Sequence, residues 1–136
     1  MKTYTLLKLT LTLLLYTVCS SAFPESLAIN PDAIVGEWQA SEHHPEQGNI
    51  DTRFLINADK TFSGSMTING APVWQYSGTW ELAGNRVTWV YLESSTILLQ
   101  EDLADTDEIL SITDEAMTYR SLRRGKESTL QRVKQK

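Results

Sequence analysis

Cysteine is almost absent from this sequence: Cys19 is the single example among 136 residues. It lies within the first 22 residues, so the rest of the chain has no thiol for a disulfide bond or for nucleophilic catalysis. A structural zinc site of the cysteine type is excluded for the same reason. Stability must therefore come from the packing of one hydrophobic core, for which about 114 residues are sufficient.

Basic residues are scarce over most of the chain. Residues 23–119 carry 16 acidic and three basic side chains, whereas residues 120–136 carry seven basic and one acidic. Such an acidic body repels polyanions, so no nucleic acid is expected as a partner. The basic end is interpreted as a last strand and tail that complement the acidic body, and an anion-binding patch is the alternative.

Catalytic motifs are missing as well. The sequence has no glycine-rich phosphate loop and no serine in a nucleophile elbow, so we expect a protein that is not an enzyme and has no cofactor. His43 and His44 lie in the segment 42–46, which is expected to be a polar loop rather than a metal site. The five acids of 101–108 lack the glycine and ligand spacing of a calcium loop and predict a solvated connector.

The first 22 residues have the pattern of a secretory signal peptide. Lys2 and Lys8 precede or interrupt an apolar run that ends near Val18, and Ser20-Ser21-Ala22 offers small residues before a cut after Ala22. The run is short and rich in threonine for a membrane span, so an uncleaved anchor is the minor alternative. Lipid attachment at Cys19 is not expected, because Val18 and Tyr16 stand where such motifs have a small residue and a leucine.

The mature chain, residues 23–136, predicts one all-β domain. Apolar and polar residues alternate with a period of two, most clearly from Trp74 to Leu82 and from Phe62 to Ile68. A single helical turn is expected near 30–33, where a proline follows an N-cap asparagine. We expect about eight strands, near 34–41, 51–57, 61–68, 73–82, 86–93, 107–113, 116–123 and 127–134; the segment 94–106 is expected to be a loop or a short helix.

The connections between these strands are short and have turn chemistry, such as Asn69-Gly70 and Ala83-Gly84-Asn85. Strands that are neighbours in sequence are therefore expected to be neighbours in space. An open antiparallel sheet of eight strands would leave two exposed edges, and closure removes both. The sequence thus predicts a single up-and-down antiparallel β-barrel of about eight strands.

The segment Ile34-Val35-Gly36-Glu37-Trp38, followed by Phe62-Ser63-Gly64 and by 76–82, resembles the small bacterial lipocalin-like domains of the calycin group. The resemblance implies that Trp38 packs at a closed end of the barrel and that an arginine from the last strand lies across its ring. Arg132 is the candidate by position and Arg120 is the rival. Gly36, Trp38 and Arg132 are thus expected to close the barrel, a structural role to which a cation–π contact would contribute about 1–2 kcal/mol.

A barrel of eight strands is either filled by side chains or holds one small ligand. The residues expected to point inward are bulky, while Gly36, Gly64 and Gly78 are expected to free space among them. A pocket would be apolar and aromatic with a few polar groups, and it would bind a small hydrophobic or amphipathic molecule. Its candidate lining residues are Trp74, Tyr76, Trp89, Tyr91, Phe54 and Met66.

Three functions remain open from the sequence. The favoured one is an exported, non-catalytic binder of a small hydrophobic molecule, located in the periplasm or the medium. The second is a packed structural or protein-interaction barrel of the cell envelope, with a working surface on the outside of strand 86–93, at Val90 and Leu92, or at the basic end. The third and least favoured is an enzyme that uses His43 or His44 with a nearby acid.

Overall fold

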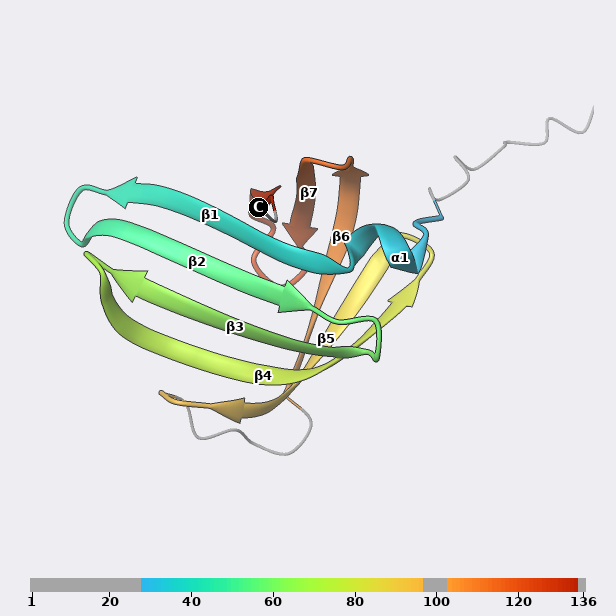
Figure 1. The fold of residues 1–136 in the computed structure, drawn as a ribbon, viewed down its shortest axis with the longest axis horizontal. Helices are drawn as coiled ribbons and strands as arrows, with labels where there is room; N and C mark the ends of the chain where they lie inside the picture. Colours follow the sequence, from blue (N-terminus) through green and yellow to red (C-terminus); the bar gives the residue numbers. More distant parts are fainter. Residues whose placement is uncertain (1–27, 97–102, 135–136) are drawn as a thin grey trace, which may run out of the picture.

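The computed structural model describes residues 28–96 and 103–134 and shows a closed antiparallel barrel. Consecutive strands lie next to each other (Figure 1). β8 pairs with β1 and so closes the ring. The all-β, eight-stranded, up-and-down barrel predicted from the sequence is confirmed. The predicted signal peptide, residues 1–22, lies outside the described residues. The elements are α1 (Pro31–Ile34), β1 (Gly36–His44), β2 (Gly48–Ile56), β3 (Thr61–Ile68), β4 (Ala71–Ala83), β5 (Arg86–Ser94), β6 (Ala104–Ile112), β7 (Ala116–Ser121) and β8 (Glu127–Arg132).

The short helix α1 marks one end of the barrel. The Asn30 side chain caps it by accepting a hydrogen bond from the Asp32 backbone, and Pro31 occupies its first turn. Ile34 at its end is fully buried, and the Ile29 backbone N–H donates to the carbonyl of Gly84 in the turn between β4 and β5. The helix therefore covers this end of the barrel, which we call the closed end.

The core follows from the period-two alternation of the strands. Buried side chains from the strands meet near the closed end, and none of the buried side chains in the described residues is polar or charged. The other end, which we call the open end, carries the turns β1–β2, β3–β4 and β7–β8, because antiparallel strands reverse direction at alternate ends. The core residues are Ile29, Ile34, Trp38, Ile56, Phe62, Trp80, Val87, Trp89, Ile109, Met117 and Leu130.

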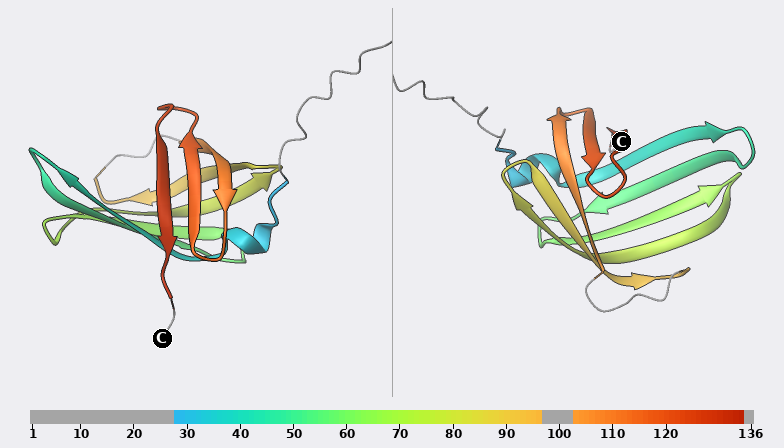
Figure 2. Two further views of the ribbon diagram at one scale, coloured as in Figure 1. Left: turned by 90° about the horizontal axis from the view of Figure 1, so that it is seen from above. Right: turned by 180° about the vertical axis from the view of Figure 1, so that it is seen from behind.

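The strands differ in length and direction. β1 to β4 run nearly side by side as one long, curved sheet, while β6 and β7 cross behind them at a steep angle (Figures 1 and 2). Register shifts in β4 at Ser77/Gly78 and in β6 between Ile109 and Ser111 accompany this change of direction. The second shift also breaks the alternation, so that Ile109 and Ile112 both contact the core.

Several expected strand boundaries were wrong, and two of the differences place candidate site residues on strands. β1 extends to His44 rather than ending near residue 41, so His43 and His44 lie on a strand and not in a loop. β6 begins at Ala104 rather than near 107, so Asp105 joins Asp107 and Glu108 on the strand, and this part of the acidic run is not a solvated connector. In both cases strand pairing satisfies the backbone while the polar side chains remain accessible or find partners.

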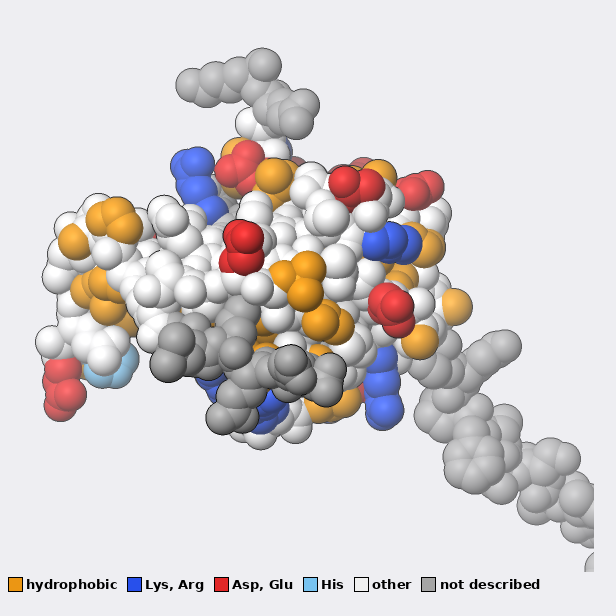
Figure 3. All heavy atoms as spheres, turned by 90° about the horizontal axis from the view of Figure 1, so that it is seen from below, with side chains coloured by type: hydrophobic (Ala, Val, Ile, Leu, Met, Phe, Trp, Pro, Cys, Tyr) orange, Lys and Arg blue, Asp and Glu red, His pale blue; other side chains and the backbone are white. Residues whose placement is uncertain are grey.

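No helix among the described residues has the length and hydropathy needed to cross a membrane. The surface seen from below is chemically mixed, with acidic, basic and apolar side chains interspersed over the part of the chain that is drawn in colour (Figure 3).

Candidate functional site

The interior of the barrel is hollow toward the open end. An inner cavity of about 110 Å³ lies next to the core. An outer cavity of about 370 Å³ lies between the inner cavity and the open end. Residues from β2, β4, β5, β6, β7 and β8 border both, so the two cavities adjoin. The shared residues are Thr52, Tyr76, Tyr91, Asp107, Tyr119 and Leu130. Together they approach the size of pockets that hold small molecules.

Aromatic rings form one wall of these cavities. Phe54 meets Trp89 edge-on with ring centroids 4.9 Å apart, and Trp74 lies 4.2 Å from Tyr76. Tyr91 contacts the Phe62 ring edge-on at 5.5 Å. Such contacts hold the rings in fixed orientations, so the wall is preorganised.

All six predicted lining residues border one cavity or both. Phe54 and Trp89 line the inner cavity, Met66 and Trp74 the outer one, and Tyr76 and Tyr91 both. The alternation of β2 to β5 brings them together, because every second residue points into the barrel. That they bind a ligand stays a prediction.

The inward glycines do not leave empty space, and that expectation was wrong. A β-carbon at Gly64 would collide with the Tyr76 ring, its cross-strand neighbour. A β-carbon at Gly36 would meet the Arg132 guanidinium, and one at Gly78 would collide with the Val90 carbonyl. A neighbouring group thus fills the space beside each of these glycines, and the cavities lie elsewhere in the barrel, toward the open end.

One carboxylate reaches the junction of the two cavities. Asp107 on β6 borders both, and its Oδ2 accepts a hydrogen bond of 2.8 Å from the indole N–H of Trp89. Burial raises the pKa of the Asp107 carboxyl; the Trp89 bond and the Arg124 charge oppose this rise, and the Asp105 charge adds to it.

Three tyrosines complete the polar part of the site. Burial raises the pKa of Tyr91 to about 12, and it also raises the pKa values of Tyr76 and Tyr119. The three hydroxyls are therefore neutral at physiological pH and available as hydrogen-bond donors or acceptors. The site thus combines aromatic surface with one half-buried carboxylate and a few hydroxyl groups.

Charged residues surround the open end, and most of them form ion pairs. Arg123 contacts Asp105 at 2.7 Å, and Lys126 lies 3.6 Å from Glu42. Arg124 also borders the outer cavity, but it forms no ion pair with any of the described residues. The opening thus carries both signs of charge, mostly neutralised in pairs.

The closed end is held by Trp38 and Arg132. The Arg132 guanidinium lies 4.1 Å from the centroid of the Trp38 ring, and Arg132 is also the cross-strand partner of Trp38. The same guanidinium donates to the backbone carbonyls of Ala33, Val35 and Asp114 at 2.7–2.9 Å. Arg132 therefore joins α1, the start of β1 and the β6–β7 turn.

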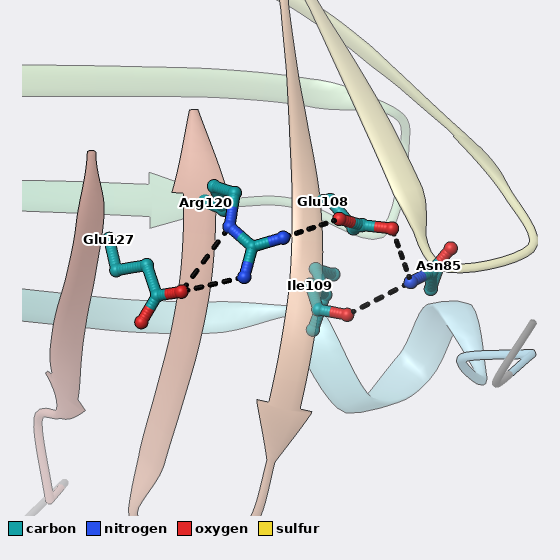
Figure 4. A network of polar contacts seen from close by, with 5 residues as sticks. All are labelled: Asn85, Glu108, Ile109, Arg120 and Glu127. Atoms are coloured by element: carbon teal, nitrogen blue, oxygen red, sulfur yellow. Dashed lines mark hydrogen bonds and ion pairs between the residues drawn. The ribbon is translucent and has the colours of Figure 1, made fainter. Parts of the chain in front are cut away.

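Arg120, the rival arginine, has a different environment. Its guanidinium lies 2.7 Å from Glu127 and 3.5 Å from Glu108, and Asn85 in turn donates to Glu108 and to the carbonyl of Ile109 (Figure 4). Arg120 thus links β6, β7 and β8 on the outside of the barrel, away from Trp38.

A comparison with protein families agrees with this geometry. The family described as lipocalin-like domain matches residues 34–119. The chain belongs to the lipocalin-like domain family. Its matched part contains Gly36, Trp38 and all six aromatic or apolar cavity residues, whereas β8 with Arg132 lies beyond it. Among curated proteins, none matches the chain significantly.

The lipocalin-like barrel also carries a hollow on its outer surface. This groove, of about 580 Å³, crosses β2 to β5 and is lined largely by serines and other polar groups, among them Ser63, Ser65 and Ser77. It borders Phe54 and Tyr76 but not Trp74, Trp89 or Tyr91, and it is more open to solvent than the interior cavities. We therefore take the interior, despite its smaller volume, as the candidate site.

The histidines lie apart from this site. A ring nitrogen of His43 lies 2.8 Å from the Asn49 side chain on the neighbouring strand, and the His44 ring accepts from the Glu46 backbone. Within residues 28–96 and 103–134, no group of three or more histidine, cysteine or acidic residues is placed to hold a metal ion.

Sequence reasoning missed Asp107, Tyr119 and Arg124. Asp105, Asp107 and Ile109 continue a period-two pattern, and Met117, Tyr119 and Ser121 do the same on β7. That pattern could have identified the first two, had the acidic run not been assigned to a connector. Arg124 lies on a turn, and no periodicity signals its position.

Proposed function

We propose that this lipocalin-like domain is an exported, non-catalytic binding protein that holds a small hydrophobic or amphipathic molecule in the interior cavities. The observation that carries the proposal is the enclosed aromatic wall beside a small number of polar groups. Pockets of this composition are typical of small-molecule sites. The two cavities favour binding over a fully packed barrel, since a packed barrel leaves no such volume.

A fluorescence titration tests the location of binding. The neutral apolar dye N-phenyl-1-naphthylamine is expected to brighten when it enters the barrel. Thr52→Phe places a ring where the two cavities meet and should lower dye affinity about tenfold or more, which corresponds to about 1.4 kcal/mol. Ser65→Phe places the same ring in the outer groove and should leave the affinity unchanged.

The two variants give opposite results if the site is elsewhere. If only Ser65→Phe loses dye binding, the dye binds in the outer groove, and the proposal is contradicted. Absence of dye binding by the unaltered protein would contradict it as well. Circular dichroism of both variants shows that each is folded before the affinities are compared.

Export is a separate part of the proposal and is supported by residues 1–22 of the sequence. When the full chain is expressed in a bacterial host, mass spectrometry of the periplasmic fraction should find a mature N-terminus at Phe23. A product that keeps Met1 and stays in the cytoplasm contradicts export without affecting the binding proposal.

A further inference from the structure

The chemistry of the cavity indicates which polar group a ligand would carry. Asp107 is the charged side chain at the junction of the inner and outer cavities, where aromatic rings form the adjoining wall. One of its carboxylate oxygens accepts the Trp89 indole N–H at 2.8 Å. Among the described residues Asp107 forms no direct ion pair, and Arg124 is the cation whose charge acts on it from a distance. A half-buried carboxylate without a direct ion pair is less well solvated than one in water, and a bound cation would offset this cost.

Most of the other charged groups around Asp107 are paired with each other rather than with Asp107. Asp105, two residues earlier on β6, is paired with Arg123, and Lys126 is paired with Glu42. Glu127 on β8 is paired with Arg120. Arg124 borders the outer cavity, and its charge lowers the pKa of Asp107, but its side chain is exposed on the β7–β8 turn and forms no ion pair with the carboxylate.

The uncharged groups around Asp107 also favour a cation. Tyr91 and Tyr119 border both cavities with neutral hydroxyls, and the faces of Trp74 and Tyr76 carry the negative part of the ring quadrupole. A cation over such faces gains stabilisation when it is desolvated. An anionic ligand would meet both the carboxylate and the ring faces, and the exposed Arg124 would be its main attraction.

We propose that the ligand of this cavity is a small aromatic or aliphatic amine, whose ammonium group binds the Asp107 carboxylate while its apolar part lies against the aromatic wall. The inference rests on the proposed binding function and adds the chemical class of the ligand. The ammonium donates a charge-assisted hydrogen bond to Asp107, stronger than the bond a neutral hydroxyl would make.

Three probes with one naphthalene ring and different polar groups test the amine preference. Isothermal titration of the full chain near neutral pH compares 1-naphthylmethylamine, 1-naphthylmethanol and 1-naphthoate. We expect the amine to bind about tenfold more tightly than the alcohol, as one charge-assisted hydrogen bond provides, and the carboxylate to bind most weakly. Equal affinities of amine and alcohol, or tightest binding of the carboxylate, would overturn the proposal.

Variants then assign the preference to its residue. Asp107→Asn keeps an acceptor for Trp89 but removes the charge, and it should reduce the amine-to-alcohol preference to about one. Asp51→Asn removes a carboxylate from the exposed face of β2 and should leave the preference intact. Preference retained in Asp107→Asn would overturn the assignment.

A second variant keeps the test valid if Asp107→Asn is poorly folded. Arg124 is exposed on a turn, so Arg124→Gln should fold normally, and it should raise the affinity for the amine by removing the competing cation. A fall in amine affinity in this variant would count against the proposal. If neither N-phenyl-1-naphthylamine nor any of the three probes binds the unaltered protein, the binding function itself fails. If the dye binds but the amine is not preferred, only the amine proposal is overturned.

Discussion

At the residue scale, Arg132 is the side chain whose chemistry is hardest to replace. Its guanidinium donates to three backbone carbonyls and also lies over the Trp38 ring. A planar group with five donors can serve several acceptors at once and still stack on a ring, whereas a lysine ammonium cannot. Trp38 is itself fully buried, and its indole N–H donates to the Ile34 carbonyl at 2.9 Å.

We therefore expect both residues to be important for stability. Trp38→Ala should lower the free energy of unfolding by about 3–5 kcal/mol, the range for a buried tryptophan. Arg132→Lys should lower it by about 1–3 kcal/mol, because it leaves carbonyl partners unsatisfied. Urea denaturation followed by circular dichroism measures both losses.

The matched control is the other arginine of the last strands. Arg120→Lys should change the free energy of unfolding by less than about 1 kcal/mol, because Arg120 forms only solvent-accessible ion pairs. If Arg120→Lys proved as destabilising as Arg132→Lys, the closure of the barrel would not depend on Arg132 in the way its contacts indicate.

At the scale of elements, the β3–β4 turn stabilises a second hairpin besides its own. Asn69 and Gly70 both have positive φ, 51° and 82°, as a two-residue hairpin turn with the twist of the strands requires. The Asn69 side chain accepts from the Asn49 backbone at 2.9 Å and donates to the Gln47 carbonyl at 3.1 Å. It thereby attaches the β1–β2 hairpin to the β3–β4 hairpin at the open end.

Substitution of Asn69 separates the conformational part of this role from the hydrogen bonds. Asn69→Ala should destabilise the protein by about 1–3 kcal/mol, since it loses two hydrogen bonds and places a β-carbon at positive φ. Asn69→Gly loses the same bonds without the conformational cost, so it should destabilise less. Urea denaturation measures both; equal losses would mean that the backbone conformation contributes nothing.

The strands could be predicted because the alternation of apolar and polar residues indicates which face of each strand is buried. The aromatic stripe of β4 and its neighbours predicts Trp74, Tyr76 and Tyr91 inside the barrel, and all three line the outer cavity. The start of β6 was not predictable in this way. Its inward residues Asp105 and Asp107 are acidic. A strand with acidic residues facing a cavity has the same sequence pattern as a solvent-exposed connector.

At the scale of the whole molecule, the barrel is packed at one end and hollow at the other. Buried residues such as Trp38, Trp80 and Phe62 fill the closed end, and the cavities lie toward the open end. Closure and family membership could be inferred from turns and motifs. The cavities could not be predicted from the sequence, because their position depends on which side chains occupy the space beside the glycines. Tyr76 occupies it at Gly64, and Arg132 occupies it at Gly36.

The polar interior should also affect how the stability of the whole domain depends on pH. The pKa of Asp107 is raised in the folded state, chiefly by burial, so the folded protein binds this proton more tightly than the unfolded chain does. The resulting stabilisation is fully present below the unfolded pKa of about 3.9 and is lost as the pH rises through the folded value. Asp107→Asn lacks this titration, so its stability relative to the unaltered protein should increase from acidic to neutral pH.

A carboxylate of the opposite kind provides the control. Hydrogen bonds from the Thr61 side chain and backbone lower the pKa of Asp59, so its contribution is present above the unfolded pKa and is lost as the pH falls through the folded value. Asp59→Asn should therefore become less stable, relative to the unaltered protein, from acidic to neutral pH. Urea denaturation at a series of pH values measures both slopes. The two slopes of relative stability against pH are expected to have opposite signs, and equal signs would mean that the interior of the barrel does not desolvate Asp107. Opposite signs would show that the charge of Asp107 destabilises the ligand-free barrel at neutral pH, as expected of a group that binds a cationic ligand.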